Sequence, residues 1–118
     1  MTNLIISLGT GKGTWAHVAK LLASQEWEKV YLVTSEFFKG KFPVDKPHEF
    51  IVVDLKMPLK QMVEHVKGKL DGKIFDTEVA INLISGTGKE HMAVLSAALK
   101  LGLGIRLVAY TGKETEEI

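Results

Sequence analysis

The sequence contains no cysteine, only three prolines, and no apolar run near the ~20 residues that a membrane-spanning helix needs. Disulfide bonds and thiolate catalysis are therefore excluded. The chain also lacks a strong excess of either charge, with 15 basic residues, 14 acidic residues and a formal net charge of +1. Non-specific nucleic-acid binding requires a broad basic surface, so we expect no direct DNA binding and no membrane association.

The N-terminal segment has neither the basic start nor the small-residue cleavage site of a signal peptide. We therefore expect a cytoplasmic protein. The length of 118 residues corresponds to one ordinary domain, which is large enough to bury a core.

Short apolar runs alternate with helical patterns along the chain. Residues 35–48 contain two prolines and a glycine and are predicted to form a loop, and residues 113–118 are predicted to be a frayed polar tail. The apolar periodicity predicts strands at 3–8, 29–34, 49–54, 78–84 and 104–110, and helices at 12–24, 58–70 and 90–101.

This alternation predicts an α/β fold in which residues 1–112 form a single Rossmann-like three-layer sandwich. Right-handed crossovers favour a mostly parallel five-stranded sheet with the strand order 3-2-1-4-5. The first and fourth strands are then neighbours at the point where the strand order reverses. Ligands of such sheets bind beside the carboxyl ends of these strands.

The tetrapeptide GTGK follows both of those strands, at Gly9–Lys12 and at Gly86–Lys89. Glycines allow the backbone to turn tightly, a helix N-terminus presents free N–H groups to anions, and threonine and lysine add a hydroxyl and a positive charge. We therefore predict one phosphate-binding pocket lined by both turns. The alternative is that both turns are merely tight connections with surface lysines. The predicted ligand-binding residues of the two turns are Gly9, Thr10, Gly11, Lys12, Gly86, Thr87, Gly88 and Lys89.

Established nucleotide-binding motifs match the turns poorly. A Walker A loop requires serine or threonine after the lysine, whereas Gly13 and Glu90 follow the two lysines. The dinucleotide fingerprint is only half met, because Thr14 occupies the position of its third glycine. Glu36 is a candidate for the acidic residue that binds a ribose, so a generic mononucleotide or dinucleotide binder remains an alternative.

The segment INLISGTGKEHMAVLSAALKLGLGIRLVAYT resembles the signature of CRISPR-associated Rossmann-fold (CARF) domains. In that family a strand leads into a loop of the type [ST]-G-G-[ST]-K and then into an apolar helix. The opening IISLGTGKGTWAHVAKLL and the strand EKVYLVTSE are also similar to the family. Residues 85–89 read SGTGK, so glycine and threonine are exchanged while the lysine keeps its place.

The resemblance implies a homodimer that binds a cyclic oligoadenylate across its two-fold axis, without a cofactor. The ligand residues that it implies are Ser7, Gly9, Thr10, Asn82, Ser85, Gly86, Thr87 and Lys89. An effector domain usually follows in this family. A chain ending at Ile118 is therefore expected to be a stand-alone sensor, a stand-alone ring nuclease, or a domain excised from a longer protein.

A ring nuclease needs no metal, because the ribose 2′-hydroxyl attacks the adjacent phosphate while the protein orients it and stabilises charge. Lys89 and Ser7 are candidates for charge stabilisation, and His91 is the best-placed acid or base because histidine titrates near neutrality. The simpler alternative is that His91 faces solvent or a dimer partner. The four histidines lack metal-ligand spacing, so we predict no metal site.

Two further segments carry structural predictions. The helix at 90–101 is apolar nearly all round, so we expect its additional apolar face to be buried in a dimer interface rather than in a deeper core. The FFKGKF segment at 37–42 is expected to pack its phenylalanines onto the core, with base stacking as the alternative. A structural domain with no ligand is the third functional possibility.

Overall fold

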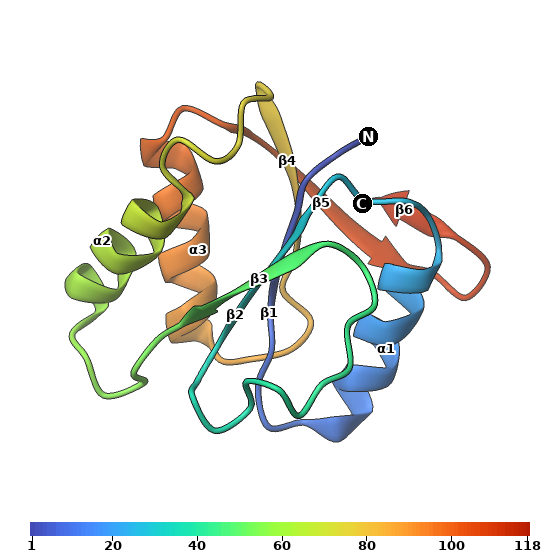
Figure 1. Ribbon diagram of the computed structural model, residues 1–118, viewed down its shortest axis with the longest axis horizontal. Helices are drawn as coiled ribbons and strands as arrows, with labels where there is room; N and C mark the ends of the chain where they lie inside the picture. Colours follow the sequence, from blue (N-terminus) through green and yellow to red (C-terminus); the bar gives the residue numbers. More distant parts are fainter.

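The computed structural model describes the backbone of residues 1–118 and every side chain except that of Lys12. Six strands and three helices alternate along the chain (Figure 1). Their order and bounds are β1 (Leu4–Ser7), α1 (Lys12–Ala23), β2 (Val30–Thr34), β3 (His48–Val52), α2 (Leu59–Leu70), β4 (Glu78–Asn82), α3 (Gly88–Lys100), β5 (Gly104–Tyr110) and β6 (Thr115–Glu117). No helix in the described chain has the length and apolar character that crossing a lipid bilayer would require.

The strands form one sheet in the order β3-β2-β1-β4-β5-β6. The first five are parallel, and β1 lies between β2 and β4, with Ile5 opposite Tyr31 on one side and Ile81 on the other. The predicted α/β fold and the predicted order of the five parallel strands are confirmed. β1 and β4 are therefore neighbours at the topological switch point, and their carboxyl ends share one edge of the sheet.

The sheet separates two hydrophobic cores. Alternate residues of each buried strand point to opposite faces, so Ile5 and Ile81 pack beneath α2 and α3 while Leu4 and Ile6 pack beneath α1. Figure 1 shows α2 and α3 together on one side of the sheet and α1 on the other. The result is the three-layer sandwich expected from the alternating pattern.

The connection from β2 to β3 has no helix in the described structure and covers the α1 side of the sheet as a loop. Phe42 of this loop is 5% exposed and belongs to the core beneath α1, as predicted. Phe38 packs edge-on against Trp15, with a ring-centroid distance of 5.8 Å. Phe37 remains 66% exposed, so the expectation that the phenylalanines pack inward is wrong for this residue.

The predicted frayed tail is wrong, because residues 115–117 form β6. This strand pairs antiparallel with β5 after a turn at Gly112, whose φ is +106°. An unpaired edge of β5 would expose a row of backbone N–H and C=O groups that another strand can satisfy. Arg106 Nη2 also lies 2.9 Å from Glu117 Oε1. The sheet therefore has six strands instead of five.

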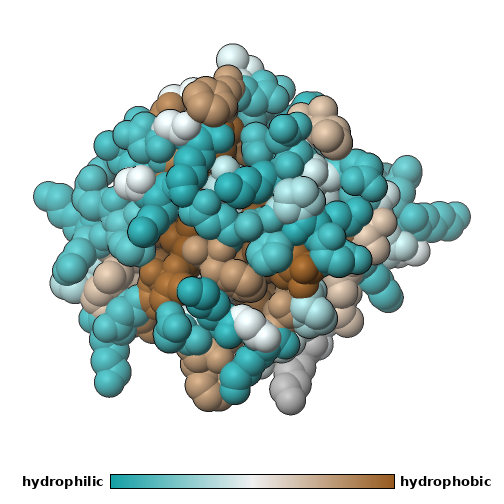
Figure 2. Space-filling model, viewed as in Figure 1, coloured by the Kyte–Doolittle hydropathy of each residue, from teal (hydrophilic) through white to brown (hydrophobic). Residues whose placement is uncertain are grey.

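Hydrophobic side chains remain visible on the face that Figure 2 shows, which is otherwise mainly hydrophilic. They gather near its middle, where Figure 1 places the strands between α2 and α1. β3 is the edge strand here, and only Ile51 of its five residues is fully buried.

Candidate functional site

The two GTGK turns touch each other beside the carboxyl ends of β1 and β4. A Cβ atom placed on Gly9 would lie 2.7 Å from the Cα of Gly86, which is closer than real side chains approach a backbone. Gly86 has a φ of +95°, a conformation that residues with side chains rarely adopt. Glycine is thus required at both positions, for different physical reasons.

Ser85 joins the two turns through hydrogen bonds. The backbone N–H of Gly9 donates to Ser85 Oγ at 2.9 Å, and Thr14 Oγ1 lies 2.9 Å from the same oxygen. The Ser85 carbonyl accepts from His91 Nε2 at 2.8 Å and from the hydroxyl of Ser7. A buried polar group without a partner costs about 1–3 kcal/mol, so these bonds help to hold the turns in contact.

A cavity of about 280 Å³ lies between the two turns and the loops that follow β2 and β3. Its walls combine backbone from both turns with a few polar and apolar side chains. The lining residues are Leu8, Gly9, Thr10, Gly11, Thr14, Ser35, Phe38, Leu55, Ile84, Gly86, Thr87 and Glu90. The predicted convergence of the two turns on one pocket is therefore present in the fold.

The two helix N-termini beside this cavity differ. The N-cap of α1 is Gly11, which offers no side chain to the first helical turn, and that turn contains no acidic residue. The N-cap of α3 is Thr87, whose N–H and hydroxyl both donate to the carboxylate of Glu90. Glu90 is 2% exposed and places a negative charge where an anion would otherwise bind. The N-terminus of α1 is thus the more favourable position for a phosphate.

The predicted ligand residues fall into two groups. Those that line the cavity are Gly9, Thr10, Gly11, Gly86 and Thr87. Those that do not are Ser7, Asn82, Ser85, Gly88 and Lys89. The side chain of Lys12 lies outside the described residues, although its backbone begins α1.

The predicted residues outside the lining have other partners. Asn82 is 2% exposed, and its Nδ2 donates to the carbonyl of Val108 at 2.8 Å, away from the cavity. The same nitrogen lies 3.1 Å from His17 Nε2. Lys89 Nζ donates to the carbonyl of Leu55 at 2.9 Å, so it reaches the loop that forms one wall of the cavity.

The three candidate catalytic residues are all engaged within the chain. Ser7 is fully buried, and its hydroxyl donates to Ser85. His91 uses Nε2 to donate to the carbonyl of Ser85, which leaves Nδ1 as its other polar atom. Neither these two side chains nor Lys89 lines the cavity. The described residues contain no cluster of histidines and carboxylates that could hold a metal ion.

Burial lowers the pKa of His17 below its usual value, and the nearby charge of Lys20 lowers it further. His17 lies on α1, and its ring approaches Asn82 at the end of β4. A neutral imidazole suits this partly buried position, because it avoids the desolvation penalty of a charge. The side chain thus connects α1 to the end of β4.

Sequence reasoning missed several residues that build the site. Trp15 donates its indole N–H to the carbonyl of Gly9 at 2.6 Å, which fixes the first turn against α1. Phe38 and Leu55 reach the cavity from loops whose paths depend on tertiary packing. Glu90 carried a readable signal, since Thr87 and Glu90 have the spacing of a capping box. No family model and no curated protein matches this chain.

Proposed function

We propose that this protein binds a cyclic oligoadenylate between two copies of the chain, as the resemblance to CARF domains implies. The observation that carries the proposal is the contact between the two glycine turns, which open into one cavity at the switch point of the sheet. Glycine-rich backbone beside a helix N-terminus is a favourable site for phosphate. Two such turns in one cavity suit a ligand with more than one phosphate.

The first turn is the proposed contact for a phosphate, because the α1 N-terminus has no side-chain cap and its first helical turn contains no acidic residue. Lys89 is the proposed source of positive charge. Its ammonium group does not line the cavity itself, but it donates to the carbonyl of Leu55, which does, and it can exchange this neutral acceptor for a phosphate oxygen. A charge-assisted hydrogen bond of this kind is stronger than a neutral one.

The second copy is proposed from the size of the cavity and from an apolar stripe that starts at Ile84 in the cavity lining and continues along α3. A volume of about 280 Å³ is at the low end for a drug-sized ligand and small for a cyclic oligonucleotide. Ile84 lines the cavity and is 50% exposed, and Met92 and Leu99 on α3 are 58% and 66% exposed. A partner that covers this stripe would bury apolar surface and enlarge the cavity across the two-fold axis.

Binding is a better-supported role than cleavage. Ser7 and His91 are held by the Ser85 carbonyl, and neither lines the cavity. A ring-nuclease activity would require at least one of them to leave this bond. A single mononucleotide is the second candidate ligand, because one chain already offers a cavity with the Phe38 ring in its wall.

Calorimetry and thermal unfolding with cyclic tetra-adenylate, cyclic hexa-adenylate, ATP and NAD test the proposal. A ligand that binds only the folded state raises its stability by RT ln(1 + [L]/Kd). We expect stabilisation by a cyclic ligand at one ring per two chains. Stabilisation by ATP or NAD alone, at one ligand per chain, would replace the proposal with the second candidate.

Lys89→Ala is expected to raise the Kd for the cyclic ligand about tenfold without unfolding the domain, because only a charge-assisted hydrogen bond is lost. Lys69→Ala, which removes an exposed lysine near the end of α2, is the matched control and should bind normally. Unchanged affinity in Lys89→Ala would contradict the proposed role.

Incubation of the ligand with protein and a chelator, followed by analysis for linear products, tests cleavage.

A further inference from the structure

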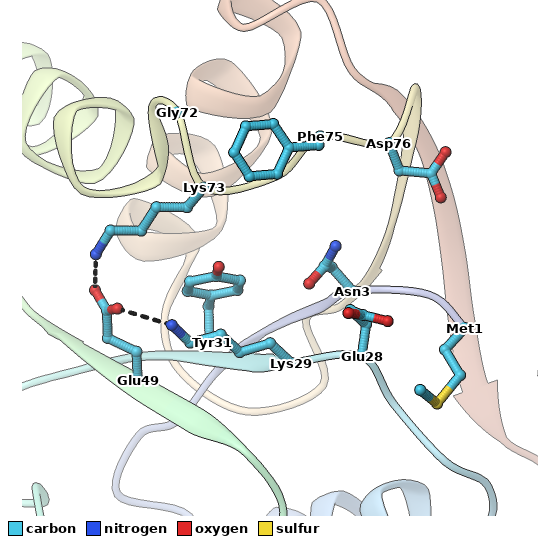
Figure 3. Close-up of a pocket in the computed structure, with 10 residues that line it drawn as sticks. All are labelled: Met1, Asn3, Glu28, Lys29, Tyr31, Glu49, Gly72, Lys73, Phe75 and Asp76. Carbon is cyan, nitrogen blue, oxygen red and sulfur yellow. Dashed lines mark hydrogen bonds and ion pairs between the residues drawn. The ribbon is translucent and has the colours of Figure 1, made fainter.

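A second and larger cavity, of about 800 Å³, lies at the opposite edge of the sheet, beside the amino ends of the strands (Figure 3). Asn3 precedes β1, Tyr31 and Glu49 lie near the starts of β2 and β3, and the loop at 72–76 connects α2 to β4. This cavity shares no lining residue with the cavity at the glycine turns. It is a separate feature that the proposed function does not use.

Two buried polar side chains form the floor of this amino-edge cavity. Asn3 is 7% exposed and Tyr31 is 1% exposed. Neither the Asn3 amide nor the Tyr31 hydroxyl has a hydrogen-bond partner in the described part of the chain. Among the described residues, every fully enclosed side-chain nitrogen or oxygen does have a partner, so these two groups must reach the cavity. Figure 3 shows both pointing into the same space.

The wall on one side is an ion-pair network that is already satisfied. Glu49 Oε1 lies 3.2 Å from Lys29 Nζ, and Glu49 Oε2 lies 2.6 Å from Lys73 Nζ. Burial raises the pKa of Tyr31, the carboxylate of Glu49 raises it further, and the charge of Lys73 opposes both effects. The Tyr31 hydroxyl therefore stays protonated and can both donate and accept a hydrogen bond.

Phe75 lies across the cavity from the strands, in the loop before β4. Its side chain is 90% exposed, the highest exposure among the large hydrophobic residues. A phenyl ring that is exposed to this extent, next to a polar floor, offers an aromatic face to a flat ligand.

We propose that the amino-edge cavity binds a purine base, free or as a nucleoside. The Asn3 amide presents a donor and an acceptor side by side, which matches the edge of a purine. The Tyr31 hydroxyl supplies a further hydrogen bond, and Phe75 supplies the stacking surface. A ligand that meets these groups satisfies two buried polar side chains at once, which the chain itself leaves open.

The charges around the cavity favour a neutral base over a phosphorylated one. The lining contains three carboxylates, of Glu28, Glu49 and Asp76, and three positive groups, which are the side chains of Lys29 and Lys73 and the N-terminal amine of Met1. Both lysines are engaged by Glu49, so an added phosphate would gain no net attraction from this balanced set of charges. This separates the amino-edge cavity from the glycine turns, which suit an anion.

Titration of adenosine into ¹⁵N-labelled protein, followed by NMR, tests the proposal, because adenosine carries no phosphate. At millimolar adenosine we expect saturable chemical-shift changes at the amides around Asn3, Tyr31 and the loop at 72–76. Phe75→Ala should raise the Kd about tenfold through loss of base stacking. Phe37→Ala, which removes an exposed phenylalanine that does not line this cavity, should bind normally.

Tyr31→Phe gives an independent measurement. The hydroxyl has no partner in the chain, so its removal should leave the midpoint of thermal unfolding unchanged while it weakens adenosine binding. The proposal is overturned if adenosine causes no shifts, if the shifts fall only at the glycine turns, or if Phe75→Ala binds adenosine as tightly as the unmodified chain.

Discussion

The two edges of the sheet differ in whether their buried polar side chains have hydrogen-bond partners within the chain. At the carboxyl edge, the side chains of Ser7, Ser85 and Asn82 are buried and hydrogen-bonded to other parts of the chain. At the amino edge, the amide of Asn3 and the hydroxyl of Tyr31 are almost as deeply buried, yet they face a cavity. The polar side chains at the carboxyl edge therefore hold the chain's own turns and strands in place, whereas those at the amino edge can hydrogen-bond to a ligand.

This difference shows what each edge can offer a ligand. The carboxyl edge presents backbone, because its glycines allow close approach and its side chains are occupied in holding the turns together. Its recognition therefore suits phosphate, which backbone N–H groups bind well. The amino edge presents side-chain hydrogen-bonding groups and an exposed aromatic ring, which suit a flat polar ligand.

Gly9→Ala should produce the largest effect, because the carboxyl edge depends on contact between two backbones. The added Cβ would lie 2.7 Å from the Gly86 Cα, so the turns must separate. We expect a loss of about 3 kcal/mol in the free energy of unfolding, measured by denaturant titration. Gly88→Ala is the control, since a Cβ there meets nothing within 4 Å. Equal stability of the two variants would show that the turns do not need to touch.

Ser85→Ala should have the next largest effect, because it removes the oxygen that joins the two turns. The buried N–H of Gly9 then loses its acceptor, and Thr14 loses a neighbour. We expect the free energy of unfolding to fall by about 2 kcal/mol. Ser96→Ala removes a hydroxyl that makes no hydrogen bond in the described chain and should leave stability unchanged within about 0.5 kcal/mol. If Ser85→Ala lowers the free energy of unfolding no more than Ser96→Ala does, water can replace the Ser85 hydroxyl without loss of stability.

The strand order was predictable because it follows from local patterns and general rules. Continuous apolar runs such as LIIS at β1 indicate strands buried on both faces, and right-handed crossovers then restrict the order. β6 was missed because its sequence, TEE, carries no apolar signal. Its pairing depends on the open edge of β5, which only the assembled sheet reveals.

The site was predictable only in part, because sequence indicates which turns converge and not which side chains remain free. The glycines of both turns follow neighbouring strands, so their meeting was expected. Asn82 and Ser85 carry suitable chemistry, but tertiary hydrogen bonds to Val108, Gly9 and His91 occupy them. The amino-edge cavity gave no sequence signal, because Asn3, Tyr31 and Phe75 are far apart in the chain and form no motif.

Acid titration should have the smallest effect, and it concerns Glu49, the carboxylate that joins the ion-pair network at the amino edge. The hydrogen bond from Lys73 lowers the pKa of Glu49 below its usual value of 4.5; burial opposes this, and Lys29 contributes in the same direction as Lys73. The unfolded chain therefore takes up the proton first as the pH falls. The stabilisation is fully present above pH 4.5 and is lost as the pH falls through the folded-state pKa.

Glu49→Gln should lower the free energy of unfolding at neutral pH by at most about 1 kcal/mol, because the pair is partly exposed. The difference in the free energy of unfolding between this variant and the unmodified chain should disappear in acid, where Glu49 is protonated and no longer attracts the lysines. Glu64→Gln, which removes a 56% exposed partner of Lys100, is the control. If the stability difference for Glu49→Gln persists in acid, its cause is packing, and the wall of the amino-edge cavity does not depend on charge.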